Sequence, residues 1–145
     1  MKKWTSVATN LPERMESVLI SDKKGRICKA FMNIGGIFIV QNTNSLPSLF
    51  YKDESMVLAW MPLPAVYKKY SREGWILVSK SLPPNDVPVL VSTEDEVFIS
   101  YCRSGESDMW WLRNNEDKDS QKVYLSKSSV VAWMPLPEFY KQKDM

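Results

Sequence analysis

Histidine is absent from this chain of 145 residues. Imidazole is the usual general base beside a Ser or Cys nucleophile and the commonest metal ligand, so its absence argues against both kinds of site. The two cysteines, Cys28 and Cys102, are too few for a structural zinc site. We therefore expect no metal and no cofactor. The two halves of the chain repeat at an offset of 71 residues, and at that offset Ile99 is the counterpart of Cys28. We therefore interpret Cys28 as a small buried hydrophobic residue.

Clusters of carboxylates are the next candidates for chemistry. Paired Asp and Glu side chains can act as a general acid and base, or can bind a divalent cation. Charge runs of this kind are usually solvated surface, and no cluster in one half of the chain has a counterpart at the equivalent place in the other half. A carboxylate-dependent hydrolase is therefore our third choice of function. The clusters are Asp53-Glu54, Glu94-Asp95-Glu96, and Glu116-Asp117 with Asp119.

Basic residues lie beside aromatic ones at Lys68-Lys69-Tyr70 and at Tyr140-Lys141-Gln142-Lys143. Such interleaving is typical of nucleic-acid-binding surfaces, and small β-barrels do bind nucleic acid. The formal net charge is only +2, which gives little electrostatic attraction to phosphate. A nucleic-acid-binding small-barrel module is thus the alternative function. The sequence shows neither a signal peptide nor a membrane span, and we expect a cytoplasmic protein with no membrane partner.

Four tryptophans mark an internal duplication. Trp4 opens the first copy and Trp75 the second, an offset of 71, while Trp60 and Trp133 each begin the closing motif Trp-Met-Pro-Leu-Pro, at an offset of 73. We expect two tandem modules, at residues 1–72 and 73–145. Large aromatic residues at equivalent positions are most simply explained as packing residues that define the modules. The structural motif comprises Trp4, Trp60, Pro62, Trp75, Trp133 and Pro135.

The hydrophobic pattern predicts an all-β fold. Short β-branched runs are bounded by turn residues, and Gly35-Gly36 is a hairpin signal. Each module is expected to hold about five short strands in a small open barrel or bent sheet, with the modules related by a pseudo-twofold axis. Residues 42–54 and 114–127 are predicted to be surface loops, and residues 65–69 and 138–142 single helical turns. The predicted strands include 18–20, 27–33, 37–41 and 56–60, then 89–91, 97–102, 109–112 and 130–134.

The order Trp-x-Ser-Val, Leu-Pro, Val-Leu-Val and Trp-Met-Pro-Leu-Pro resembles a small domain of unknown function that is common in phage and prophage genomes. Both copies resemble it, although Leu77 stands where the first copy has Ser6. The family has no established activity that could be transferred to this chain, so the resemblance implies no catalytic residue. It implies a phage or prophage accessory protein in a bacterial cytoplasm. We accordingly predict a non-catalytic protein that binds a host or phage protein.

The differences between the copies indicate where a specific partner would bind. Trp110 and Trp111 are adjacent in a predicted strand, so their side chains point to opposite faces. An outward indole with a polar surround is typical of an interface anchor. We therefore hypothesise that Trp110 or Trp111 anchors a protein partner, with Arg113 and Glu116 at the rim. Their counterparts in the first copy, at an offset of 72, are Phe38 and Ile39.

Overall fold

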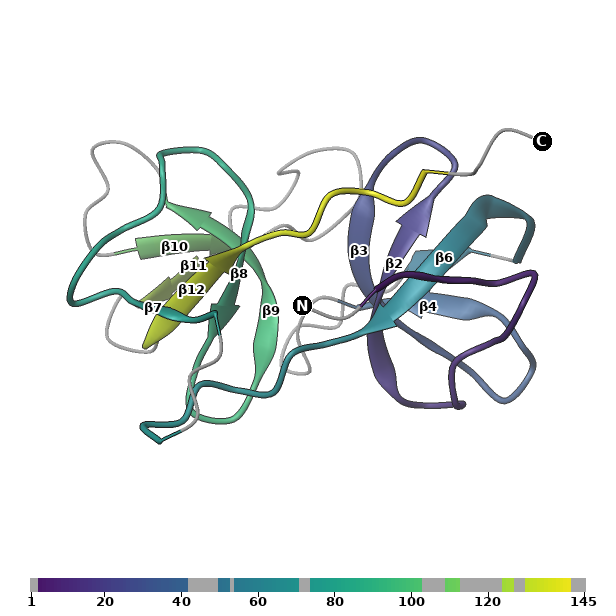
Figure 1. Ribbon diagram of the computed structural model, residues 1–145, viewed down its shortest axis with the longest axis horizontal. Helices are drawn as coiled ribbons and strands as arrows, with labels where there is room; N and C mark the ends of the chain where they lie inside the picture. The colour runs from purple at the N-terminus through teal and green to yellow at the C-terminus, as the bar shows by residue number, and fades with distance from the viewer. Residues whose placement is uncertain are drawn as a thin grey trace. The chain divides into compact units, whose positions relative to one another are not determined.

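A computed structural model describes residues 3–41, 50–52, 54–70, 74–102, 109–112, 124–126 and 130–141 (Figure 1). These residues form two antiparallel sheets of six strands each, with one short 3-10 turn, η1 (Glu54–Met56), and no α-helix. The all-β prediction is confirmed. Each sheet is open, since within the described residues its two outermost strands do not pair with each other. No helix in that part of the chain is long and apolar enough to cross a membrane.

The two sheets have the same strand order. The first runs β1-β6-β2-β3-β4-β5, and the second runs β7-β12-β8-β9-β10-β11. Each closing strand therefore lies between the opening strand and the Val-Leu strand of its own sheet. The first sheet contains β1 (Thr5–Ser6), β2 (Ser17–Asp22), β3 (Ile27–Met32), β4 (Phe38–Val40), β5 (Phe50–Lys52) and β6 (Val57–Pro62). The second contains β7 (Ile76–Leu77), β8 (Val89–Ser92), β9 (Val97–Cys102), β10 (Met109–Leu112), β11 (Tyr124–Ser126) and β12 (Ala132–Pro135).

Strands β5 and β11 correct the sequence prediction. Both lie in stretches that we expected to be surface loops, 42–54 and 114–127, and each pairs with the strand of the preceding hairpin, β4 or β10. Residues 65–69 and 138–142 were expected to form helical turns. Where the structure describes them they are not helical: Lys68 forms an isolated bridge, Lys69 lies in a turn, and residues 65–67 and 138–141 carry no regular structure.

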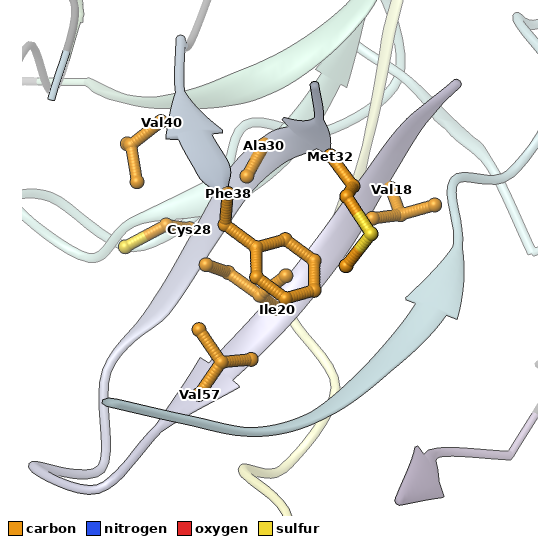
Figure 2. Close-up of a cluster of buried hydrophobic side chains, with 8 residues drawn as sticks. All are labelled: Val18, Ile20, Cys28, Ala30, Met32, Phe38, Val40 and Val57. Carbon is orange, nitrogen blue, oxygen red and sulfur yellow. The ribbon is translucent and has the colours of Figure 1, made fainter. Parts of the chain in front are cut away.

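One cluster of buried hydrophobic side chains lies on a single face of the first sheet and follows the period of two that strands impose (Figure 2). Alternate residues of β2, β3 and β4 point to this face, and Phe38 and Ile20 belong to the same cluster. The partly buried Val7 and Trp60 pack against this cluster. The buried cluster comprises Val18, Ile20, Cys28, Ala30, Met32, Phe38, Val40 and Val57.

The register of the strands corrects one alignment made from the sequence. Ser21 pairs with Ile27 across a turn of five residues, 22–26, whereas Ser92 pairs with Val97 across a turn of four, 93–96. The offset between the copies thus falls to 70 in the third strand. Cys28 therefore corresponds to Phe98 rather than to Ile99. Both Cys28 and Phe98 are buried, so Cys28 occupies a core position as expected.

Candidate functional site

All four repeat tryptophans donate their indole N–H groups to backbone carbonyls. Trp60 donates to Asn10 at 3.0 Å, and Trp133 donates to Ser81 at 2.9 Å. Asn10 and Ser81 are themselves equivalent at an offset of 71 and immediately precede the Leu-Pro pairs. Trp133 is 7% exposed and Trp60 is half-buried. Each closing tryptophan therefore links the closing strand of its sheet, β6 or β12, to the loop that follows the opening strand, β1 or β7.

The opening tryptophans bind a different part of the chain. Trp4 Nε1 donates to the carbonyl of Glu138 at 2.8 Å, and Trp75 Nε1 donates to the carbonyl of Ala65 at 3.1 Å. Both carbonyls belong to the segment that follows a closing motif. The acceptors, at 138 and 65, differ by 73, the offset of the closing motifs themselves.

A buried serine makes the second contact with each of these segments. The amide of Tyr140 donates to Ser21 Oγ at 3.1 Å, and the amide of Tyr67 donates to Ser92 Oγ at 2.8 Å. Ser21 and Ser92 have no exposed surface. We call Trp4 with Ser21 the first docking site, occupied by residues 137–141. Trp75 with Ser92 is the second docking site, occupied by residues 64–68.

The compact units therefore do not coincide with the sequence modules, and one of them is built from two parts of the chain. One unit comprises Met1–Leu63 with Pro137–Met145, and the other comprises Pro64–Leu136. Residues 137–141 belong to the first unit, where the amide of Tyr140 contacts Ser21 of β2. The units differ from the modules 1–72 and 73–145 in that each contains the segment that follows the other module's closing motif.

Proline explains why each segment leaves its own sheet. Pro62 ends β6 and Pro135 ends β12, and a second proline follows two positions later in both copies. Proline lacks an amide donor, and it restricts the residue before it to extended conformations. Leu63 and Leu136, each flanked by prolines, are thus held extended. After β6 and after β12 the chain therefore continues in an extended conformation and does not fold back on the strand that has just ended.

An ion pair is buried in the first unit. Lys52 Nζ lies 2.5 Å from Asp22 Oδ2, and neither side chain is appreciably exposed. Asp22 Oδ1 also accepts the amides of Lys24 and Arg26, each at 2.9 Å. Burial raises the pKa of the Asp22 carboxyl, but the hydrogen bond and charge of Lys52, together with the two amides, outweigh burial and leave the pKa below its ordinary value.

The second unit lacks this ion pair. The strand registers place Thr93 at the position of Asp22 and Leu125 at that of Lys52. The Thr93 hydroxyl accepts the amide of Glu96 at 3.2 Å, so it caps the β8–β9 turn as the Asp22 carboxylate caps the β2–β3 turn. Both members of the pair have changed together. The pair is therefore a feature of the first copy and not of the shared scaffold.

The tryptophan pair lies in β10, an inner strand between β9 and β11. Trp110 pairs with Cys102, and Trp111 pairs with Tyr101. These registers match Trp110 to Phe38 and Trp111 to Ile39, as the sequence offset of 72 indicated. Phe38 and Ile39 are both buried in the first unit. The side chains of the two tryptophans, and all of Arg113 and Glu116, lie outside the described residues, so their role in binding stays a prediction.

The described residues include only part of the acidic clusters named from the sequence. Among the residues that the structure describes, no three His, Cys, Asp or Glu side chains lie close enough together to hold a metal ion. Asp95 accepts a hydrogen bond from the Thr93 hydroxyl at 3.2 Å within the β8–β9 turn. Asp53 and the cluster from Glu116 to Asp119 lie outside the described ranges.

Sequence reasoning missed the docking sites, although two signals for them were present. Ser21 and Ser92 are identical at an offset of 71, and Tyr67 and Tyr140 are identical at an offset of 73. Nothing in a linear sequence showed that the serine of one copy would meet the tyrosine of the other.

Residues 74–138 match the sequence model of a family described as a protein of unknown function (DUF551). The match spans all six strands of the second sheet, from β7 to β12, and covers less than half of the chain. No curated protein and no solved structure matches the chain.

Proposed function

We propose that this chain is a non-catalytic binding protein, a phage- or prophage-type accessory factor whose partner is a host or phage protein. The observation that carries this proposal is the twice-repeated docking site, in which an indole and a buried serine bind the backbone of a segment from outside the contiguous module. Binding of an extended backbone is a common way for proteins to recognise one another. The phage context rests on the sequence resemblance.

We also propose that the first module is a second copy of the family domain matched at residues 74–138. The shared strand order supports this, and so does a shared turn conformation. Met15 and Asp86, which are equivalent at an offset of 71, both have positive φ, at 69° and 63°. Their amides donate to Met32 and to Cys102, each at 2.7 Å. A positive φ is uncommon outside glycine, so its recurrence indicates common descent.

Affinity capture tests the binding function. The tagged full-length chain is added to a bacterial lysate treated with nuclease, and retained proteins are identified by mass spectrometry. We expect one protein retained in a near-stoichiometric amount, and the purified pair to bind in calorimetry. Failure to retain any protein, or a catalysed reaction of the retained one, would contradict the proposal.

Nucleic-acid binding is the second candidate, and one contact favours it. Tyr70 is 92% exposed, and Lys69 Nζ lies 5.8 Å from the centre of its ring. An exposed aromatic ring beside a cation can stack on a base. Retention of single-stranded DNA that weakens steeply with salt, and that Tyr70→Ala abolishes, would favour this candidate over the first.

A further inference from the structure

Each docking site binds the peptide backbone of the segment that occupies it. In each, a tryptophan donates to the carbonyl of the residue after a proline, and a serine accepts the amide two residues further on. Both groups belong to the peptide backbone, so neither contact depends on the side chains of the bound segment. A segment from another chain could make the same two contacts.

The two occupants show which side chains matter. Pro64-Ala65-Val66-Tyr67-Lys68 and Pro137-Glu138-Phe139-Tyr140-Lys141 share proline, tyrosine and lysine but differ in the two middle residues. The proline and tyrosine are half-buried in both segments. Ala65, Glu138 and Phe139 are exposed, and so are both lysines. The class of segment that fits is therefore an extended Pro-x-x-Tyr peptide.

The side chains at the first docking site are more exposed to solvent than those at the second docking site. Its tryptophan, Trp4, is half-buried, whereas Trp75 of the second site is 7% exposed. Phe139 is 48% exposed, whereas Val66, at the corresponding position, is half-buried. Burial of apolar surface is the main favourable term in such contacts, so the segment on the first site is held less firmly.

We infer that the first docking site, formed by Trp4 and Ser21, is a binding site for an extended Pro-x-x-Tyr segment of the partner protein, which displaces residues 137–141 of the chain itself. This inference rests on the proposed binding function and names its site and ligand class. The chain's own segment acts as a tethered competitor, at an effective concentration of about millimolar. A partner at lower concentration must therefore bind more tightly than that segment does.

Breaking the tethered contact tests the inference. The probe is a fluorescein-labelled peptide with the sequence of residues 135–141, and binding is followed by fluorescence anisotropy. Tyr140→Pro removes the amide that donates to Ser21 Oγ. In the full-length chain this change frees the site, and we expect the peptide to bind at least about tenfold more tightly than to the unaltered chain. Made in the peptide instead, the same substitution should abolish binding, whereas Phe139→Ala in the peptide should not.

Matched tryptophan variants then locate the site. In the Tyr140→Pro chain, Trp4→Phe should weaken peptide binding by about fivefold, because one hydrogen bond is lost. Trp75→Phe makes the equivalent change at the second docking site and should leave the affinity unchanged. Equal effects of the two variants, or no binding of the peptide to the Tyr140→Pro chain, would overturn the inference.

A measurement on the unaltered chain covers the case in which the Tyr140→Pro chain fails to fold. Excess peptide should release residues 137–141 and speed tryptic cleavage after Lys141, with cleavage after Lys68 and Lys69 unchanged. No change at Lys141 in saturating peptide would overturn the inference. If a captured partner still binds the Trp4→Phe chain while the peptide does not bind at all, the partner site lies elsewhere and the proposed binding function stands.

Discussion

At the scale of single residues, the chain contrasts two ways of building the same turn. Asp22 caps the β2–β3 turn and pairs with Lys52, whereas Thr93 caps the β8–β9 turn with a neutral hydroxyl. A buried ion pair costs desolvation that its Coulomb attraction only partly offsets, so an apolar replacement of both partners is often neutral. Loss of one partner is different, because it leaves a charge buried without compensation.

We therefore expect Lys52→Met to lower the free energy of unfolding by about 3–5 kcal/mol at pH 7. The double change of Asp22→Thr with Lys52→Leu, which copies the second module, should recover most of that loss. Urea unfolding of the three proteins measures both effects. A double variant no more stable than the single one would show that the pair cannot be replaced as the second copy suggests.

The same pair gives a pH dependence with a definite sign. The pKa of Asp22 is lowered in the folded chain, so its contribution is full above the unfolded value of 3.8 and is lost as the pH falls through the lower folded value. Below about pH 4 the unaltered chain should therefore lose this part of its stability, and the double variant should not. Identical acid unfolding curves for the two proteins would contradict this.

The tryptophan pair gives a separate prediction. Trp111 takes the register position of Ile39, and because an indole is larger than the Ile39 side chain, we expect part of Trp111 to be available to a partner. Trp111→Ala should then weaken binding of a captured partner by about 2 kcal/mol or more while the fold persists. Unchanged affinity, measured by calorimetry beside a circular dichroism control, would remove this residue from the interface.

At the scale of elements, one turn in each module carries backbone strain. Met15 and Asp86 hold left-handed conformations, and their amides bond to the end of β3 or β9. Aspartate tolerates this region better than methionine does. Met15 is 58% exposed, so its side chain contributes little packing.

Met15→Gly should consequently raise the free energy of unfolding by about 0.5–1 kcal/mol, because glycine adopts positive φ without steric cost. Asp86→Gly should gain less, and Met15→Ala, which keeps a Cβ, should gain nothing. Thermal unfolding of the three variants provides the comparison. Destabilisation by Met15→Gly would mean that the methionine side chain makes a contact worth more than the strain.

Elements with local signals were predictable from the sequence, and elements that depend on distant pairing were not. The β3–β4 hairpin followed from its two glycines, and Gly36 does have a positive φ of 86°. The closing strands end at Pro62 and Pro135 as expected. Strand β5 has only three residues within a polar stretch, and it forms because it pairs with β4. A pairing partner 10 or more residues away leaves no local pattern to recognise.

At the scale of the whole molecule, the described residues form two sheets of one topology, each completed by the segment that follows the other module's closing motif. The repeat predicted the number of sheets, but the sequence could not tell which sheet each segment would join. The paired prolines hold Leu63 and Leu136 extended, and the contacts at Ser21 and Ser92 show which sheet each segment joins. Both sites bind backbone atoms of their occupants, which differ only in the two residues between the proline and the tyrosine.

Amide hydrogen exchange in two serine variants tests this exchange most directly. Ser21→Ala removes the acceptor of the Tyr140 amide, and Ser92→Ala removes the acceptor of the Tyr67 amide. Ser21→Ala should therefore speed exchange at Tyr140 and leave Tyr67 protected, and Ser92→Ala should do the reverse. If Ser21→Ala instead deprotects Tyr67 while Ser92→Ala deprotects Tyr140, each segment completes its own module, and the exchanged architecture is wrong.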